Sequence, residues 1–428
     1  MTINFFKGHP TKRLFPAKVI AESYTKVLSR SYDEYENDVD NQHPLAYGTD
    51  PGNLLVRKSI GKWNSDFYSR PVDPDSINLT AGASYGIANI LSACTSHDIT
   101  KQAFIVTPTY FLINGAFIDA GFEGKLTAID ECENSPNSTS KYDIDLEYLE
   151  SKLIHFSKDI PPNDPSVVDD PERGKWKLYR FVIYIVPTFS NPGGMLYSVE
   201  TRTKLIELAR KYDMLIVSDD VYDMLNYGTV SKPIPKLIHL DIDSNPTPYG
   251  NVISNCTFSK IIAPGLRLGW QETVNKSLAL QLSSTGANRS GGTPGQLASF
   301  VVQDLIDTGE IDTIIANFKS TYKARSDALV KAAREILPAS TKIHGGDGGY
   351  FFWITIPGDI DHDQVVEQLS KQGVILASGK HFEVLGDERF WGKNCVRLCV
   401  SYLETADIIA GIEKWGQVLK QTYPQLYT

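Results

Sequence analysis

Short apolar runs alternate with amphipathic segments along most of the chain. The runs at residues 103–108, 181–187, 214–218 and 251–258 have the length of buried strands. Between the second and third runs, residues 198–213 carry apolar side chains at helical spacing, and Ser198 stands where an N-cap is expected. This alternation predicts an α/β protein, with a parallel sheet covered by helices.

The last quarter of the chain has a different pattern. Residues 312–337 have the length and periodicity of one long helix, and a new apolar run follows at 348–357. A chain of 428 residues also exceeds the size that one hydrophobic core usually serves, so about two domains are expected. We place the domain boundary on the long helix.

Composition and charge exclude several classes of partner. The formal net charge is -9, whereas nucleic acids and anionic membranes require basic surfaces. No stretch approaches the ~18 apolar residues of a membrane span. The five cysteines and eight histidines show no spacing typical of a metal site. We therefore expect a cytoplasmic protein with no nucleic-acid partner, no membrane partner and no metal.

Each of the four predicted strands is followed by a residue that could bind a ligand. These residues are Tyr110, Asn191, Asp219 and Lys260. Ligands of parallel α/β sheets bind beyond the carboxyl ends of the strands, so we expect the four to converge. A lysine in a partly desolvated site has a lowered pKa and can form a Schiff base with an aldehyde. Pyridoxal 5'-phosphate is a biological aldehyde that also needs an acidic partner and a phosphate cradle.

The segments after the strands offer a partner for each part of this cofactor's ring. Lys260 would form the Schiff base, and Asp219 would keep the pyridine nitrogen protonated, which lets the ring act as an electron sink. Asn191 and Tyr222 would donate hydrogen bonds to the phenolic oxygen, and Tyr110 would stack on the ring.

The phosphate cradle is expected at residues 80–86, a turn of small residues that leads into an apolar helical run. Backbone N–H groups of Ala83 and Ser84 would meet the phosphate at the helix N-terminus. Three side chains at or after the end of the fourth predicted strand would complete the cradle: Thr257, Ser259 and Arg267.

The chain resembles a known enzyme family through six motifs in a fixed order. They read TAGASYG, PTY, NPGG, DDVY, SKIIAPGLRLGW and NCVRLCVSY. Together they resemble the fold-type I class I and II aminotransferases, most closely the branch of aromatic, kynurenine and 2-aminoadipate aminotransferases. The resemblance implies a three-layer α/β/α large domain with a mostly parallel sheet over residues 46–315. It also implies a smaller α+β domain formed by residues 1–45 and 316–428.

The same resemblance implies a transaminase that uses amino acids and 2-oxo acids in a ping-pong cycle. Lys260 would move a proton between the substrate Cα and the cofactor, and Arg397 would bind the substrate carboxylate. Tyr47 would reach the phosphate of the neighbouring subunit, so a homodimer is expected. Two positions depart from the family pattern: Gly193 replaces a threonine in the N-P-T-G motif, and Ala83 stands where serine or threonine is usual.

Three functions remain open at this level. The first is transamination of 2-aminoadipate or an aromatic amino acid, with 2-oxoglutarate as acceptor. The second is a cysteine-conjugate β-lyase, and the third is a non-catalytic regulatory domain of the same fold. For the substrate side chain, Lys12 or Arg13 would suit a distal carboxylate, whereas Phe15 and Phe382 would suit a ring.

Overall fold

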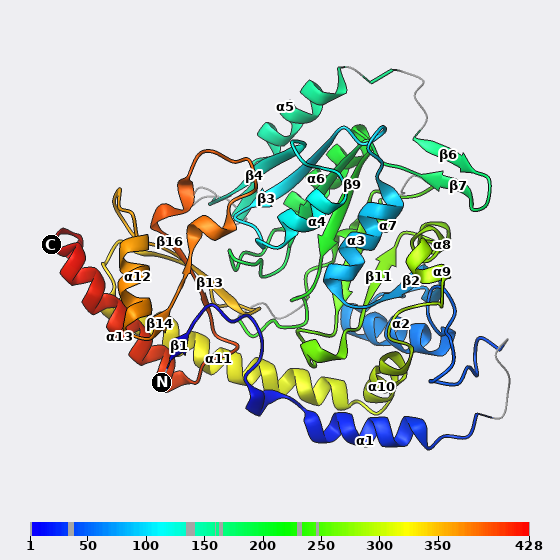
Figure 1. The fold of residues 1–428 in the computed structure, drawn as a ribbon, viewed down its shortest axis with the longest axis horizontal. Helices are drawn as coiled ribbons and strands as arrows, with labels where there is room; N and C mark the ends of the chain where they lie inside the picture. Colours follow the sequence, from blue (N-terminus) through cyan, green and yellow to red (C-terminus); the bar gives the residue numbers. More distant parts are fainter. Residues whose placement is uncertain are drawn as a thin grey trace.

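The computed structural model describes residues 2–32, 38–133, 142–158, 160–161, 166–228, 233–244 and 248–427. A large α/β body and a smaller body that contains both chain ends lie side by side (Figure 1). Among these described residues, no helix is both long enough and apolar enough to cross a bilayer. Within the same ranges, no group of His, Cys, Asp or Glu side chains is arranged to hold a metal ion.

The large body is built on a mostly parallel sheet, as predicted. The described strands of this sheet follow the order β2 (Ile77–Thr80), β11 (Gly269–Thr273), β10 (Val252–Thr257), β9 (Met214–Asp219), β8 (Phe181–Ile185), β3 (Gln102–Thr107), β4 (Leu126–Glu133) and β5 (Tyr142–Ile144). The strands from β10 to β4 are parallel, whereas β11 and β5 run antiparallel to their neighbours.

Helices cover both faces of this sheet and give the predicted three layers (Figure 1). One face packs against α2 (Leu54–Tyr68), α3 (Ala83–Cys94), α4 (Ile113–Asp119), α8 (Lys276–Ser283) and α10 (Gln296–Asp307). The other packs against α5 (Leu146–Ser157), α6 (Val199–Lys211) and α7 (Leu237–Asp243). Side chains of β3 alternate between the two cores, since Ile105 belongs to the first and Phe104 to the second. Ser198 caps α6 as expected, and its hydroxyl accepts from the Thr201 backbone at 3.1 Å.

The smaller body is α+β, as predicted. Its sheet has the order β12 (Lys342–Gly345), β13 (Phe351–Thr355), β16 (Cys395–Cys399) and β15 (Ala377–Ser378), with antiparallel pairing throughout. The N-terminal strand β1 (Ile3–Asn4) pairs in parallel with β14 (Val374–Ile375), so the two ends of the sequence share one unit. The helices α12 (Asp363–Lys371) and α13 (Thr405–Thr422) complete it.

The helix α11 (Glu310–Ile336) is continuous across the predicted boundary at residue 315. The helix α1 (Ala17–Leu28) packs along α10, and Ser23 donates to Asp304 at 2.7 Å. Lys26 also pairs with Asp304 at 2.7 Å. The division at residues 45 and 315 stays a prediction. Apart from short 3-10 helices, the remaining described elements are the short α9 (Gly286–Arg289) and a hairpin of β6 (Val167–Asp170) and β7 (Gly174–Lys177).

Candidate active site

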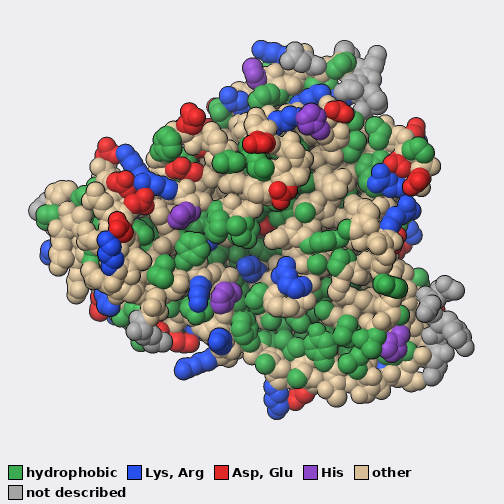
Figure 2. Space-filling view, in the orientation of Figure 1, with side chains coloured by type: hydrophobic (Ala, Val, Ile, Leu, Met, Phe, Trp, Pro, Cys, Tyr) green, Lys and Arg blue, Asp and Glu red, His purple; other side chains and the backbone are tan. Residues whose placement is uncertain are grey.

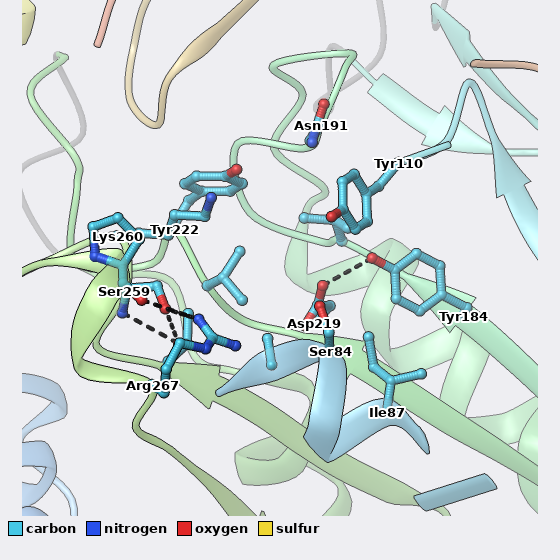
Figure 3. A pocket seen from close by; sticks show the side chains of 15 residues that line it. Ser84, Ile87, Tyr110, Tyr184, Asn191, Asp219, Tyr222, Ser259, Lys260 and Arg267 are labelled. Atoms are coloured by element: carbon cyan, nitrogen blue, oxygen red, sulfur yellow. Dashed lines mark hydrogen bonds between the residues drawn. The ribbon is translucent and has the colours of Figure 1, made fainter. Parts of the chain in front are cut away.

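The residues expected at the carboxyl ends of the strands line one cavity (Figure 3). Including its open mouth, the cavity encloses about 710 Å³ of space that protein atoms do not fill. Ten of the predicted residues contribute to its wall: Ala83, Ser84, Tyr110, Asn191, Asp219, Tyr222, Thr257, Ser259, Lys260 and Arg267. Figure 3 shows Lys260, Ser259 and Arg267 on one side, and Asp219 and Tyr110 on the other.

Lys260 follows β10 and lies in a largely desolvated position. Burial lowers the pKa of its amine to about 8, against a smaller opposing effect of the nearby Cys399 and Asp219. Its Nζ donates to the Gly8 carbonyl at 3.4 Å, and the Tyr350 hydroxyl donates to the Lys260 carbonyl at 2.7 Å. The side chain is therefore available to a ligand while its backbone is fixed.

Asp219 is the last residue of β9 and is held by residues of the two flanking strands. Tyr184 on β8 and Asn255 on β10 each donate a hydrogen bond of 2.8 Å to its carboxylate. Burial raises the pKa of Asp219 to about 6, although both hydrogen bonds lower it. The apolar pattern does not single out Tyr184 or Asn255, because both lie inside runs that predict buried strands. The sequence feature that could have identified them is a polar side chain within each otherwise apolar run.

The first turn of α3 also lines the cavity, through Ala83 and Ser84. Its N-cap, Gly82, has a φ of 94° and supplies no capping side chain, so backbone N–H groups of the first turn remain for a ligand. Arg267 donates to the Ala81 carbonyl at 3.0 Å and to the Ser259 hydroxyl at 3.4 Å. A Cβ at Gly82 would lie 2.9 Å from the Arg267 guanidinium, so the glycine permits this close approach.

Arg397 lies on β16 of the smaller body and contacts Asn191 of the cavity wall, although it is not itself one of the lining residues. Its Nη1 donates to Asn191 Oδ1 at 3.0 Å and its Nη2 donates to the Phe6 carbonyl at 2.6 Å. The buried Nε has no hydrogen-bond partner among the described residues. The guanidinium carbon lies 4.3 Å from the Phe351 ring centroid and 4.8 Å from that of Phe382. An unused donor between apolar walls suits a carboxylate ligand.

The N-terminal segment closes one side of this region. Phe6 is within ring-contact distance of Phe111, with centroids 5.9 Å apart, and its carbonyl meets Arg397. Lys12 and Arg13 are exposed and do not line the cavity. Phe382 is fully buried. The sequence analysis names Lys12, Arg13 and Phe15 of this segment as candidates for binding the substrate. It does not identify Phe6, whose backbone carbonyl accepts from Arg397.

Tyr47 lies apart from the cavity within one chain. Tyr47 is 85% exposed, and the nearby Leu45 is 67% exposed. Figure 2 shows hydrophobic side chains gathered on the face that holds the hollow between the two bodies, with a few lysines and arginines among them. The described residues leave most of the Tyr47 side chain uncovered, which fits its expected reach towards a second subunit.

The donor set of the cavity fits pyridoxal phosphate. An uncapped helix N-terminus, hydroxyl groups and a guanidinium stand at one end and match a phosphate dianion. A carboxylate stands at the other end and matches a protonated ring nitrogen. Lys260, with its lowered pKa, lines the same cavity.

Comparison with known proteins gives the same family as the site. Residues 23–414 match the family model for aminotransferase class I and II. An uncharacterized protein of Saccharomyces cerevisiae is 45% identical, over 98% of this chain and 97% of its own length. The mitochondrial kynurenine/alpha-aminoadipate aminotransferase of Mus musculus is 30% identical, over 98% of this chain and 92% of its length. The structure of Pyrococcus horikoshii kynurenine aminotransferase, solved with PMP, superposes with a TM-score of 0.78 at 26% identity. It covers 98% of this chain and 91% of the other.

Proposed function

Because this chain belongs to the class I and II aminotransferases, we propose that it moves the α-amino group of an aromatic amino acid to a 2-oxo acid such as 2-oxoglutarate. The family uses pyridoxal phosphate, and the transfer follows a ping-pong cycle in which the donor leaves as its oxo acid before the acceptor binds. The observation that carries the substrate class is the aromatic wall beside Arg397.

This wall consists of Phe6, Phe111 and Phe382. The ring centroids of Phe111 and Phe382 are 5.8 Å apart, and those of Phe6 and Phe111 are 5.9 Å apart. Phe6 and Phe111 are only partly buried, so a substrate ring bound through its carboxylate to Arg397 can extend the cluster. The kynurenine relatives support this substrate class.

2-Aminoadipate is the second candidate donor. The mouse relative is named for kynurenine and α-aminoadipate together, which supports both. However, Lys12 and Arg13 are both exposed, so they offer the distal carboxylate no buried cation. For this reason we rank the aromatic donor first.

The proposed chemistry divides among four side chains. When bound, pyridoxal phosphate supplies a conjugated ring that takes up the electron pair left by breaking the Cα–H bond. Lys260 Nζ, neutral above a pKa of about 8, would accept the proton from the substrate Cα and deliver it to C4′, the former aldehyde carbon of the cofactor. Asp219 would hold a proton on the ring nitrogen, and Asn191 and Tyr222 would donate to the phenolic oxygen.

Arg397 decides which bond to Cα breaks. A bidentate pair with the carboxylate fixes that group near the plane of the ring and leaves the Cα–H bond perpendicular to it. Its contacts with Asn191 and Phe6 fix the guanidinium in position. The arrangement therefore favours transamination over decarboxylation.

The test is the visible absorbance of the purified protein with pyridoxal phosphate, before and after single amino acids are added without an acceptor. We expect an aromatic amino acid to convert the cofactor stoichiometrically to its amine form, and added 2-oxoglutarate to reverse the change. Lys260→Ala should abolish the conversion, whereas Lys18→Ala, at a lysine that is 89% exposed, should not.

Three other results of this absorbance test would each indicate a different function or substrate. Conversion by 2-aminoadipate but not by aromatic donors would replace the substrate class. Continuous release of pyruvate and ammonia without an acceptor would indicate a β-lyase. Absence of any cofactor band would contradict the assignment of Lys260 and favour a regulatory domain.

A further inference from the structure

The glycine that departs from the family motif lies against a buried acidic side chain. A Cβ at Gly193 would lie 2.5 Å from Glu131 Oε2 and 2.8 Å from the Ser190 hydroxyl oxygen. Both distances are shorter than ordinary van der Waals contacts, so threonine does not fit here while Glu131 keeps its position. Glu131 thus occupies the space that the family threonine would need.

Glu131 lies on β4. The turn that contains Gly193 follows β8, and β3 lies between β8 and β4 in the sheet. The Tyr197 hydroxyl donates to Glu131 Oε1 in a short hydrogen bond. Its Oε2 is buried beside Ser190. Burial raises the pKa of Glu131 to about 7, with a smaller opposing effect of the hydrogen bond from Tyr197. Oε2 has no hydrogen-bond partner among the described residues, so packing against the turn is what it contributes there.

Ser190 connects this carboxyl group to the turn that carries Asn191. The Met195 backbone donates to the Ser190 hydroxyl at 3.2 Å, and the Ser190 backbone donates to the Met195 carbonyl at 3.1 Å. Gly194 donates to the Ser190 carbonyl at 2.7 Å. The turn is closed on itself, and Asn191 projects from it to accept from Arg397.

The opposite side of the turn lies against the smaller body. Gly194 has a φ of 66°, and a Cβ there would lie 2.7 Å from Gly345 Cα and 2.9 Å from the Phe351 carbonyl. The turn is therefore packed between Glu131 on one side and, on the other, the backbone where β12 ends and β13 begins. Displacement on the Glu131 side would shift Asn191 relative to Arg397.

We propose that Glu131 is a positioning residue for Asn191, because its carboxyl group fills the space beside Gly193 and holds the turn of residues 190–195. This inference rests on the proposed contact of Asn191 with cofactor and substrate. Glu131 itself touches neither and acts through Ser190 and the turn.

The test combines four variants: Glu131→Ala, Glu131→Gln, Gly193→Thr and the double variant Glu131→Ala/Gly193→Thr. Four quantities are measured, namely the dissociation constant of pyridoxal phosphate from the apo-protein, the KM and the kcat for the amino donor, and the melting temperature. Gly115→Thr is the matched control, since a Cβ at Gly115 meets no atom within 4 Å.

We expect Glu131→Ala and Gly193→Thr each to weaken cofactor binding and raise KM by about tenfold, the size of one misplaced contact. Glu131→Gln should stay within about threefold of the wild type, because the amide has nearly the same size and its oxygen can still accept from the Tyr197 hydroxyl. The double variant should be less impaired than the product of the single effects, since threonine then fills the vacated space.

Dependence on Asn191 separates positioning from general stability. In an Asn191→Ala background, Glu131→Ala should add no further change to KM or cofactor affinity, although it can still lower the melting temperature. Multiplicative effects in this background, or a Glu131→Ala protein with unchanged KM and affinity, would overturn the inference. Failure of the proposed function would instead appear as a wild type that converts no donor at all.

Discussion

At the scale of single residues, the lysine at the centre of the site makes a chemical prediction. The pKa of Lys260 is lowered to about 8 by burial, and the electrostatic effects of Cys399 and Asp219 partly offset this lowering. Its neutral, nucleophilic fraction in the apo-protein therefore rises as the pH increases through 8, whereas ordinary lysines titrate near 10.4.

Labelling with a trace amine reagent over pH 6 to 11, followed by mass spectrometry of peptides, measures this directly. Lys18 in the same digest is the exposed reference. Asp219→Asn removes one of the neighbours that raise the pKa, so the midpoint for Lys260 should move to lower pH. A midpoint for Lys260 that coincides with that of Lys18 would mean that the site does not desolvate the amine.

The residue types of the site could be predicted from the sequence, but their supports could not. Lys260, Asp219 and Arg267 were predicted because each follows a buried strand and matches one chemical requirement of the cofactor. Tyr184 and Asn255 were not, because their contacts with Asp219 depend on strand order in the sheet. The contact of the Phe6 carbonyl with Arg397 could not be predicted either, because every residue has a backbone carbonyl and no sequence pattern marks this one.

At the scale of elements, α3 can present its N-terminus only because a glycine lets it approach the sheet. A Cβ at Gly86 would overlap Asn255 Oδ1 and lie 3.5 Å from Gln271 Nε2, on β10 and β11. Gly86→Ala should therefore push the first turn of α3 away from the sheet. We expect a loss of about 1–3 kcal/mol in stability and weaker binding of pyridoxal phosphate.

The helical Gly115 in α4 gives the matched comparison, because its side-chain position is open. Gly115→Ala should stabilise the protein by about 0.5–1 kcal/mol through the lower entropy of the unfolded chain. Denaturant unfolding of the apo-protein and fluorescence titration with the cofactor measure both effects. Equal behaviour of the two variants would show that α3 does not depend on the contact with Asn255.

The strands and helices that periodicity predicts are present in the structure. The runs at 181–187 and 214–218 became β8 and β9, and the long helix appears as α11. The segment 348–357 is a strand only from Phe351 onwards, because its first residues form the turn that packs on Phe189. The pairing of β1 with β14 could not be predicted, since two residues are too short for a pattern.

At the scale of the whole molecule, the site is assembled from both bodies and, in our proposal, from two chains. Asn191 comes from the large body, Arg397 from the smaller one, and the Phe6 carbonyl from the N-terminal segment. Tyr47 is 85% exposed and contributes nothing to the cavity of its own chain. If it binds the phosphate of a neighbouring subunit, one chain alone is an incomplete enzyme.

Complementation between two defective subunits tests this arrangement. Tyr47→Ala and Lys260→Ala should each be strongly impaired as pure proteins. When the two are co-expressed with different tags, half of the dimers are hybrids, and each hybrid has one site with Lys260 from one chain and Tyr47 from the other. Random assembly should therefore restore about one quarter of wild-type activity. If Tyr47 instead acts within its own chain, each hybrid contains one site with only Lys260 and one with only Tyr47, and no activity returns. Sedimentation of the wild type then separates a dimer with independent sites from a monomer.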